Sequence, residues 1–291
     1  MAQNKNVQES ELYKGKIKIR FFPDSHQYWV NAVRKTGVTT FIGILDKSRA
    51  LMSWKGQRVA DFLLTALKKG KITEELVCAA SYIDEIEKEE AGVVGSEIHD
   101  WCERYIKAKL GDGEMPDMPE RKEVQVGVNA FLDWEKEHNV KFLSSERVVY
   151  SKKHDFIGKM DIEAKVDGKL CLVDLKSSNG LYNTVGMQTA AYMFADMEES
   201  GREYKGRWAV RLPKYDEAEY LEREEKKKEI KKLIKKYKGE EFKDYPIPAY
   251  VAFEAKYLDE KAGSFEYDFD AFLHAKALFL WNKDTDYFLN K

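Results

Sequence analysis

The stretch GKMDIEAKVDGKLCLVDLKSS, residues 158–178, decides the fold that the sequence predicts. Two segments of alternating character flank Asp167-Gly168, a residue pair that strongly favours a two-residue type I′ turn between antiparallel strands. The stretch is therefore predicted to be a β-hairpin. Its turn also predicts the pairing register, because Val166 then faces Lys169 and every other pair follows by counting outward.

Two pairs of like charges follow from this register. Asp161 is predicted to lie opposite Asp174, and Lys159 opposite Lys176. Directly opposed residues have Cβ atoms about 5 Å apart, so two facing carboxylates repel each other. A divalent cation between them would turn the repulsion into attraction. Two carboxylates with water ligands suit Mg²⁺ or Mn²⁺, which take oxygen ligands in octahedral geometry.

The strand alternation predicts one apolar face and one polar face for the hairpin. The apolar face, expected on the core, comprises Met160, Ile162, Ala164, Val166, Cys171, Val173 and Leu175. The polar face comprises Lys159, Asp161, Glu163, Asp174 and Lys176. A simpler alternative is that this polar face is only a solvated surface. The small residues that follow, Ser177 and Ser178, favour an accessible site instead.

The composition is that of a globular protein expected in the cytoplasm. The 291 residues are 43% hydrophobic and 34% charged, with a formal net charge of −2. Any binding of nucleic acid must therefore come from a local basic surface. No apolar run approaches the ~20 residues of a membrane span. The three cysteines, expected to be reduced and buried, are too scattered for a zinc site, a disulfide framework or a four-cysteine iron–sulfur cluster.

Periodicity along the chain predicts an α/β (α+β) fold with a mixed central sheet flanked by helices. Strands are expected within 16–31, 144–151, 158–176 and 207–213, and helices within 38–70, 83–110, 121–138, 181–200, 216–238 and 269–283. We divide the chain into an amino-terminal portion of strands and helices, residues 1–120, and a core, residues 121–291. A charged helical insertion is expected at 214–243.

The residues Asp161 and Asp174-Leu175-Lys176 resemble the signature of the PD-(D/E)xK nuclease superfamily. The closer resemblance is to its RecB-like branch, which includes phage exonucleases and the mitochondrial genome maintenance exonuclease. Further features of that branch are GVVGSEIHDWCE with His99, SSERVVYS with Glu146, and QTAAY with Gln188 and Tyr192. The chain departs from the branch at Met160, where proline is common, and it lacks the cysteines that hold an iron–sulfur cluster in some relatives.

The resemblance implies a restriction-endonuclease-like core and a role for each matched residue. Asp161, Asp174 and the Leu175 carbonyl would bind Mg²⁺ or Mn²⁺, with His99 as a further ligand. No iron–sulfur cluster is expected. Lys176 would handle the attacking water. The remaining candidates are Gln188 and Tyr192 for positioning, Glu146 as a metal ligand, a supporting group or plain surface, and Glu103, which would hold the imidazole or face solvent.

Several residues are candidates for contact with nucleic acid. The helix at 221–238 has nine basic and four acidic residues, and its basic side could track phosphates. The candidates are Lys159, Ser177, Ser178, Lys231 and Lys235, with Trp54, Trp101, Tyr105 and Phe156 as possible stacking platforms for bases. The alternatives are a solvated charged helix and aromatic residues that belong to the core.

The sequence therefore predicts a metal-dependent DNA exonuclease acting at single-stranded ends. It would act in phage or bacterial DNA replication, recombination or repair. We expect it in the bacterial cytoplasm, with a recombinase or a replication protein as a candidate partner. Three alternatives stay open: a nucleic-acid-binding module that has lost the chemistry, a site-specific or structure-specific endonuclease, and a scaffold without a site. Cleavage polarity, the preference for DNA over RNA, the number of metals and the oligomeric state are not determined.

Overall fold

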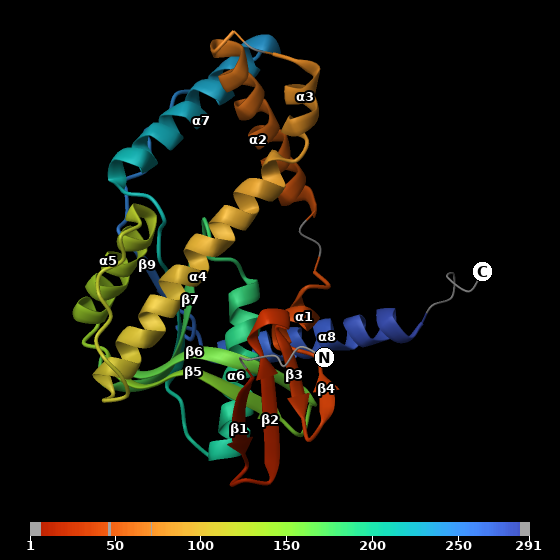
Figure 1. The fold of residues 1–291 in the computed structure, drawn as a ribbon, viewed down its shortest axis with the longest axis vertical. Coiled ribbons are helices and arrows are strands. Elements are labelled where there is room, and N and C mark those ends of the chain that lie inside the picture. The colour runs from red at the N-terminus through yellow and green to blue at the C-terminus, as the bar shows by residue number, and fades with distance from the viewer. Residues whose placement is uncertain (1–6, 46–47, 71, 286–291) are drawn as a thin grey trace.

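The computed structural model describes residues 7–45, 48–70 and 72–285, apart from the side chains of residues 48–50, 234 and 237. Its polypeptide begins with a four-stranded antiparallel meander at the base of the molecule (Figure 1). The strands are β1 (Gln8–Leu12), β2 (Ile17–Phe22), β3 (Gln27–Val30) and β4 (Val33–Lys35), with a short 3₁₀ turn at Pro23–Ser25 between β2 and β3.

The second sheet has five strands in sequential order, β5 to β9. Its strands are β5 (Lys141–Ser151), β6 (Phe156–Val166), β7 (Lys169–Lys176), β8 (Gly206–Arg211) and β9 (Glu254–Tyr257). Only β7 and β8 run parallel, and α6 (Thr184–Ser200) makes the crossover between them. The predicted mixed α/β fold with a helix-flanked sheet is confirmed. The short edge strand β9 was not predicted, because four residues give too little alternation to detect.

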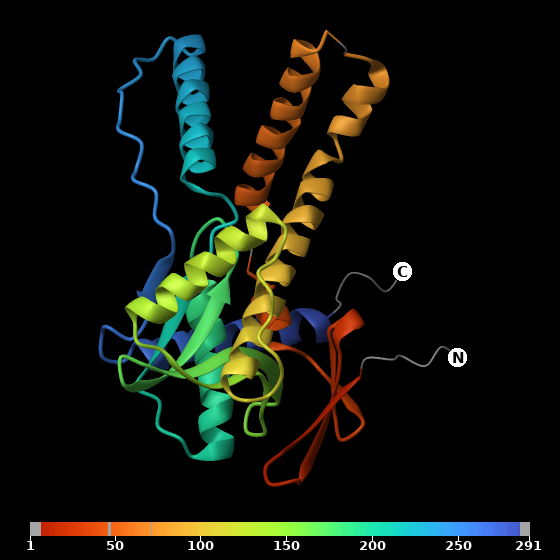
Figure 2. The ribbon, with the colours of Figure 1, turned by 60° about the vertical axis from the view of Figure 1, so that its left-hand side comes forward.

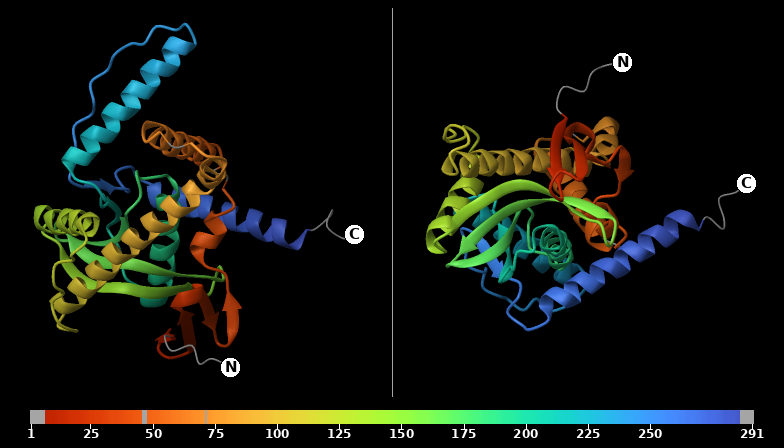
Figure 3. Two further views of the ribbon diagram at one scale, coloured as in Figure 1. Left: turned by 45° about the horizontal axis from the view of Figure 1, so that its top comes forward. Right: turned by 90° about the horizontal axis from the view of Figure 1, so that it is seen from below.

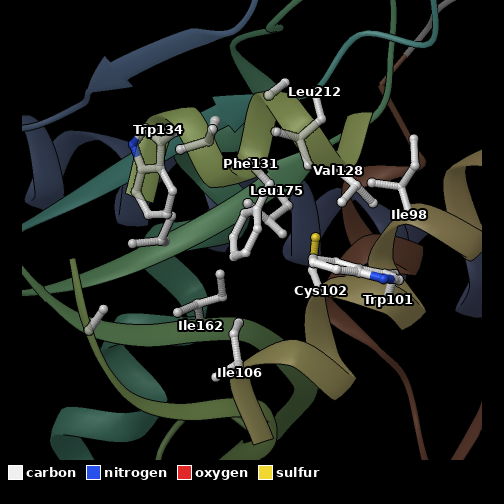
Figure 4. Packing of buried hydrophobic residues seen from close by; sticks show 14 of the residues in the cluster. Ile98, Trp101, Cys102, Ile106, Val128, Phe131, Trp134, Ile162, Leu175 and Leu212 are labelled. Carbon is white, nitrogen blue, oxygen red and sulfur yellow. The ribbon is translucent and has the colours of Figure 1, made fainter. Parts of the chain in front are cut away.

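One face of this sheet packs against two helices, α4 (Ile83–Lys109) and α5 (Lys122–Glu137). Figure 4 shows how Ile98 and Ile106 from α4 and Phe131 from α5 meet Ile162 and Leu175 of the hairpin. The predicted helix at 121–138 is confirmed, and its apolar residues are buried because they recur on one side of the helix.

The opposite face packs against α1 (Val38–Ile42), α6 and α8 (Ser264–Asp284). The view from below shows α6 lying between the strands and α8 (Figure 3). The periodicity at 38–70 is interrupted after α1, at Gly43, and continues in α2 (Ser48–Lys68). Helices on both faces explain why the strand residues Glu163 and Asp174 are buried. The polar side of the hairpin is therefore not a solvated surface.

The hairpin register is confirmed for five pairs, from Val166↔Lys169 to Ile162↔Val173. The paired residues stop there, one step before Asp161 and Asp174, and Lys159 is not paired with Lys176.

The predicted single apolar face of the hairpin was wrong for Met160. Its side chain packs with α6 and α8, whereas Ile162 packs with α4 and α5. The alternation of the strand breaks at Asp161, which lies between these two residues.

Two helical arms project from the sheet region (Figure 2). One arm is formed by α2, α3 (Glu74–Ala80) and the first part of α4. The other arm is α7 (Glu217–Tyr237), which lies within the predicted insertion. In the part of the chain that the structure describes, no helix has the length and apolar character needed to span a lipid bilayer.

Two of the three cysteines are in the core, as expected. Cys102 and Cys171 are buried, but Cys78 in the first arm is exposed, so its expected burial was wrong. The amino-terminal sheet and the central sheet also share a core cluster, in which Tyr28 and Val30 pack against Val148 and Ile157. This shared cluster fixes the first sheet beside the start of β6.

Candidate metal-binding site

A cavity of about 850 Å³ lies where the amino-terminal sheet, α4, the β6–β7 hairpin and α6 meet. Charged and polar side chains from distant parts of the sequence converge on it. Among them are His99, Glu146, Lys159, Asp161, Ser177 and Lys214. The cavity therefore brings predicted site residues into one place, together with residues that the sequence did not indicate.

Three of these side chains form a compact group of possible metal ligands. His99 comes from α4, Glu146 from β5 and Asp161 from β6, and one ligand atom from each lies within 4.8 Å of the other two. His99 Nδ1 is 3.9 Å from Asp161 Oδ2. One nitrogen and two carboxylates make a donor set that suits Mn²⁺ and also accommodates Mg²⁺.

The backbone at Glu146 explains how its carboxylate joins this group. Its φ is 53°, in the left-handed region that costs a non-glycine residue about 1–2 kcal/mol. Regular pairs, Ser145↔Ile162 and Arg147↔Met160, stand on either side, but Glu146 and Asp161 themselves are not paired. This local irregularity is of the kind that concentrates at functional sites.

A second group of polar residues lies beside these ligands. Asp174 is fully buried, and its Oδ2 lies 2.5 Å from Lys176 Nζ. Gln188 Nε2 donates to Asp174 Oδ1 and to the Tyr192 hydroxyl, both at 3.2 Å. The predicted Gln188–Tyr192 pair on α6 thus contacts one hairpin acid, because Gln188 bonds to Asp174 and holds its carboxylate in a defined orientation.

The two groups are joined through Leu175. Its backbone N–H donates to Asp161 Oδ2 at 2.8 Å. The sequence assigned the Leu175 carbonyl as a metal ligand, whereas the contact that the structure shows is made by the amide. Asp174 lies outside the compact ligand group, which contains Glu146 in its place.

The electrostatics of the site favour a bound cation. Burial, together with the nearby Asp161 carboxylate, raises the pKa of Glu146 to about 7. Burial also raises the pKa of Asp161 and brings that of Asp174 to about 6. For His99, burial lowers the pKa to about 4, so its imidazole is neutral and has a lone pair to offer.

These shifts provide the test of whether the residues fit a metal. Carboxylates held close together in an enclosed site resist ionisation because each destabilises the charge of the other. Lys159 forms an ion pair with Glu146, yet the pKa of Glu146 remains raised. A divalent cation would stabilise the ionised form of both acids, and the neutral His99 completes its ligands. The residues present therefore fit Mg²⁺ or Mn²⁺.

The other candidate residues fall into two sets. Ser177, Ser178 and Lys159 line the cavity. Glu103 also lines it, but its carboxylate contacts Lys107 Nζ at 2.6 Å and does not hold His99. Lys231 and Lys235 lie on the α7 arm and line a separate hollow. The structure therefore does not bring these two lysines to the ligand group.

The aromatic candidates are mostly core residues. Trp101 and Phe156 are buried, and Tyr105 stacks on Trp101 with a ring-centroid distance of 5.1 Å. Trp54 lines a cavity of about 590 Å³ between α2 and α7. For Trp101 and Phe156 the core interpretation is the correct one.

Among the cavity residues that the sequence did not indicate are Tyr28 and Lys214. Tyr28 lines the cavity from the amino-terminal sheet, and burial, followed by the charges of Glu146 and Asp161, raises the pKa of its phenol. Lys214 lines it from the segment between β8 and α7. No local pattern could have found either residue, because long-range packing alone brings them to the hairpin.

No protein-family model matches this chain, and no curated protein is significantly similar to it.

Proposed function

We propose that this protein is a metal-dependent nuclease that hydrolyses the phosphodiester bonds of DNA. One observation carries the proposal: the cavity is lined by the ligand group of His99, Glu146 and Asp161, and the backbone amide of Leu175 joins Asp161 to the adjacent Asp174–Lys176 ion pair. Acids that hold a cation, next to an ammonium group, form an arrangement suited to phosphoryl chemistry. The resemblance to the PD-(D/E)xK signature rests on three of the same residues.

The residues have distinct roles in this proposal. His99, Glu146 and Asp161 would hold Mg²⁺ or Mn²⁺, and a cation there would supply Lewis-acid polarisation of the phosphate. Lys176 orients the attacking water and stabilises negative charge on the phosphate oxygens. Asp174 fixes the position of the Lys176 ammonium.

On α6, Gln188 donates a hydrogen bond to the Asp174 carboxylate, and the same amide donates to the Tyr192 hydroxyl. Tyr192 thus orients Gln188, and Gln188 fixes the carboxylate relative to α6. The metal ligands and the water-handling lysine are thereby tied to both helical layers of the fold, which is the kind of rigid support that catalytic geometry needs.

We further propose that the protein is an exonuclease that acts at single-stranded DNA ends in the cytoplasm, in replication, recombination or repair. Two features of the cavity support a nucleic-acid substrate. Lys159 and Lys214 place positive charge in it, and the small side chains of Ser177 and Ser178 leave room for a backbone.

The test is digestion of DNA labelled at its 5′ or 3′ end, single- or double-stranded, linear or covalently closed, with Mg²⁺, Mn²⁺ or EDTA. We expect metal-dependent loss of nucleotides from linear single strands and no cleavage of circles. Asp161→Asn should abolish it. Glu203→Gln is the matched control, because the Glu203 side chain is 86% exposed.

Other outcomes assign other functions. Cleavage of closed circles would identify an endonuclease. Metal-dependent binding of DNA without turnover would identify a binding module, and full activity of Asp161→Asn would refute the proposed site.

A further inference from the structure

Within the described part of the chain, no acidic side chain forms an ion pair with Lys214, a lysine that lines the cavity. Lys159, the other lysine lining it, forms an ion pair with Glu146. The Lys214 ammonium instead donates to the backbone carbonyl of Ala91 on α4, and it makes no ion pair with any residue that the structure describes. An ammonium group has three N–H donors, and a partly buried one that uses a single donor within the protein can bind an anion from outside with the others.

A hydroxyl lies next to this ammonium. Ser177 Oγ and Lys214 Nζ both approach the same side of Gly95. A Cβ on residue 95 would collide with Ser177 Oγ and would lie 3.5 Å from Lys214 Nζ. Gly95 therefore lets α4 pass close to the end of β7, so that the two donors lie side by side in the wall of the cavity.

The position of this pair relative to the metal ligands is set by one helix. His99 follows Gly95 by four residues on α4, so the two positions lie on the same helix face about one turn, or ~5.4 Å, apart. The donors at Gly95 are thus displaced along the cavity from the ligand group. They are suited to a second phosphate and not to the one being hydrolysed.

We infer that Lys214 and Ser177 form a phosphate subsite that binds the group next to the scissile phosphate of a nucleic-acid strand. This inference rests on the proposed nuclease function and names how its substrate is held. The ligand is a phosphate oxyanion, which is either an internal diester or a terminal monoester. The subsite fixes the position of the strand relative to the metal ligands, so Lys214 is a substrate-binding residue.

The first test uses binding without hydrolysis. Fluorescence anisotropy with a short single-stranded oligonucleotide in EDTA is measured at several salt concentrations for the wild type, Lys214→Ala and Lys165→Ala. Lys165 is the control, because it is an exposed lysine of the same hairpin that does not line the cavity. Losing one phosphate contact should reduce the slope of log K against log salt by about 0.7. Equal slopes for Lys214→Ala and Lys165→Ala would overturn the inference.

The second test locates the phosphate. Cleavage is measured on oligonucleotides in which a single phosphate, at successive positions around the cut, is replaced by an uncharged methylphosphonate. A further pair of oligonucleotides carries or lacks a terminal phosphate. For the wild type we expect one replacement beside the scissile position to raise KM about 5- to 50-fold. Lys214→Ala should show the same rise on unmodified DNA and no further rise with that replacement.

The outcomes separate this inference from the proposed function. If the wild type neither binds nor cleaves DNA, both fail. If the wild type cleaves DNA, but Lys214→Ala and the methylphosphonate replacement raise KM by independent factors that multiply when combined, only the inferred subsite is wrong. Sensitivity confined to the terminal phosphate would identify the monoester as the ligand. Lys214→Arg keeps the charge, so its KM should return close to the wild-type value. That result would show that the raised KM of Lys214→Ala does not come from a folding defect.

Discussion

Glu146 and Asp161 face each other across β5 and β6 in a break between two regular pairs, and their carboxylates approach the imidazole of His99. The left-handed backbone of Glu146 and the enclosure of both acids are unfavourable in the protein alone. A bound cation reverses the electrostatic part of that penalty. The relationship between these two residues therefore leads to predictions about stability as well as about activity.

Divalent metal is expected to stabilise the wild type and not a variant that lacks one ligand. A site saturated at 100 times its Kd adds about 2.7 kcal/mol to the free energy of unfolding. Differential scanning fluorimetry with MnCl₂ or MgCl₂ should therefore raise the melting temperature of the wild type and of Glu203→Gln. For Glu146→Gln and Asp161→Asn the rise should largely disappear. An unchanged rise in both ligand variants would show that the metal binds elsewhere.

The stability of the metal-free protein should depend on pH through Glu146. Burial raises the pKa of its carboxyl from 4.5 to about 7, so between these values the folded state binds more protons than the unfolded state. The contribution of Glu146 to the free energy of unfolding is therefore fully present below pH 4.5 and is lost as the pH rises through 7.

Denaturant unfolding in EDTA at pH 4.5 and pH 7.5 tests this dependence. Relative to Glu146→Gln, which cannot ionise, the wild type should lose about 1–3 kcal/mol between the two values. A wild type that gains stability relative to the variant over this range would contradict the raised pKa.

Replacing Lys176 should separate catalysis from metal binding. Because its ammonium contacts Asp174 and lies outside the ligand group, Lys176→Ala should retain a metal-induced rise in melting temperature. Its cleavage rate should fall about 10²- to 10⁴-fold, as expected for the loss of a group that acts on the reacting atoms. Single-turnover cleavage with saturating Mn²⁺ measures this effect. Wild-type rates in Lys176→Ala would remove the lysine from the mechanism.

Gly158 should be intolerant of a side chain because Tyr192 lies against it. A Cβ at residue 158 would overlap the Tyr192 ring, which is buried and cannot retreat into solvent. Gly158→Ala is expected to destabilise the protein by about 1–3 kcal/mol. It should also lower activity, since Tyr192 accepts the hydrogen bond from Gln188.

The matched control for this substitution is Gly56→Ala. Gly56 lies within α2, and a Cβ there would meet no atom within 4 Å. Alanine favours a helix over glycine by about 1 kcal/mol, so this variant should be as stable as the wild type or slightly more stable. Chemical denaturation of both variants measures the contrast, and equal stability of Gly158→Ala and the wild type would refute the packing argument.

Some of the site followed from local sequence. The Asp167-Gly168 turn determines the hairpin register, because a two-residue turn leaves the strands only one way to pair. The spacing of Gln188 and Tyr192 placed both on one side of α6, where they meet Asp174 through Gln188. Turn geometry and helical periodicity act over a few residues, so they can be read from the chain directly.

Other features depended on the tertiary structure. The sequence placed Asp161 opposite Asp174 as the pair of ligands, whereas the structure brings Glu146 to Asp161 and leaves Asp174 with Lys176 and Gln188. This depends on the backbone of Glu146 and on the break in pairing, neither of which has a signature in residue type. Helical packing on both sheet faces likewise made the polar side of the hairpin a buried one.

By itself, the sequence determined the hairpin, its register and the residue types that chemistry at a phosphate would need. Only the tertiary structure decided which of those residues meet, and it added Tyr28 from the first sheet and Lys214 from beyond β8. The physical reason is one of range. Pairing and periodicity arise between near neighbours, whereas the convergence of side chains on a cavity is fixed by how whole layers of helices and strands pack together.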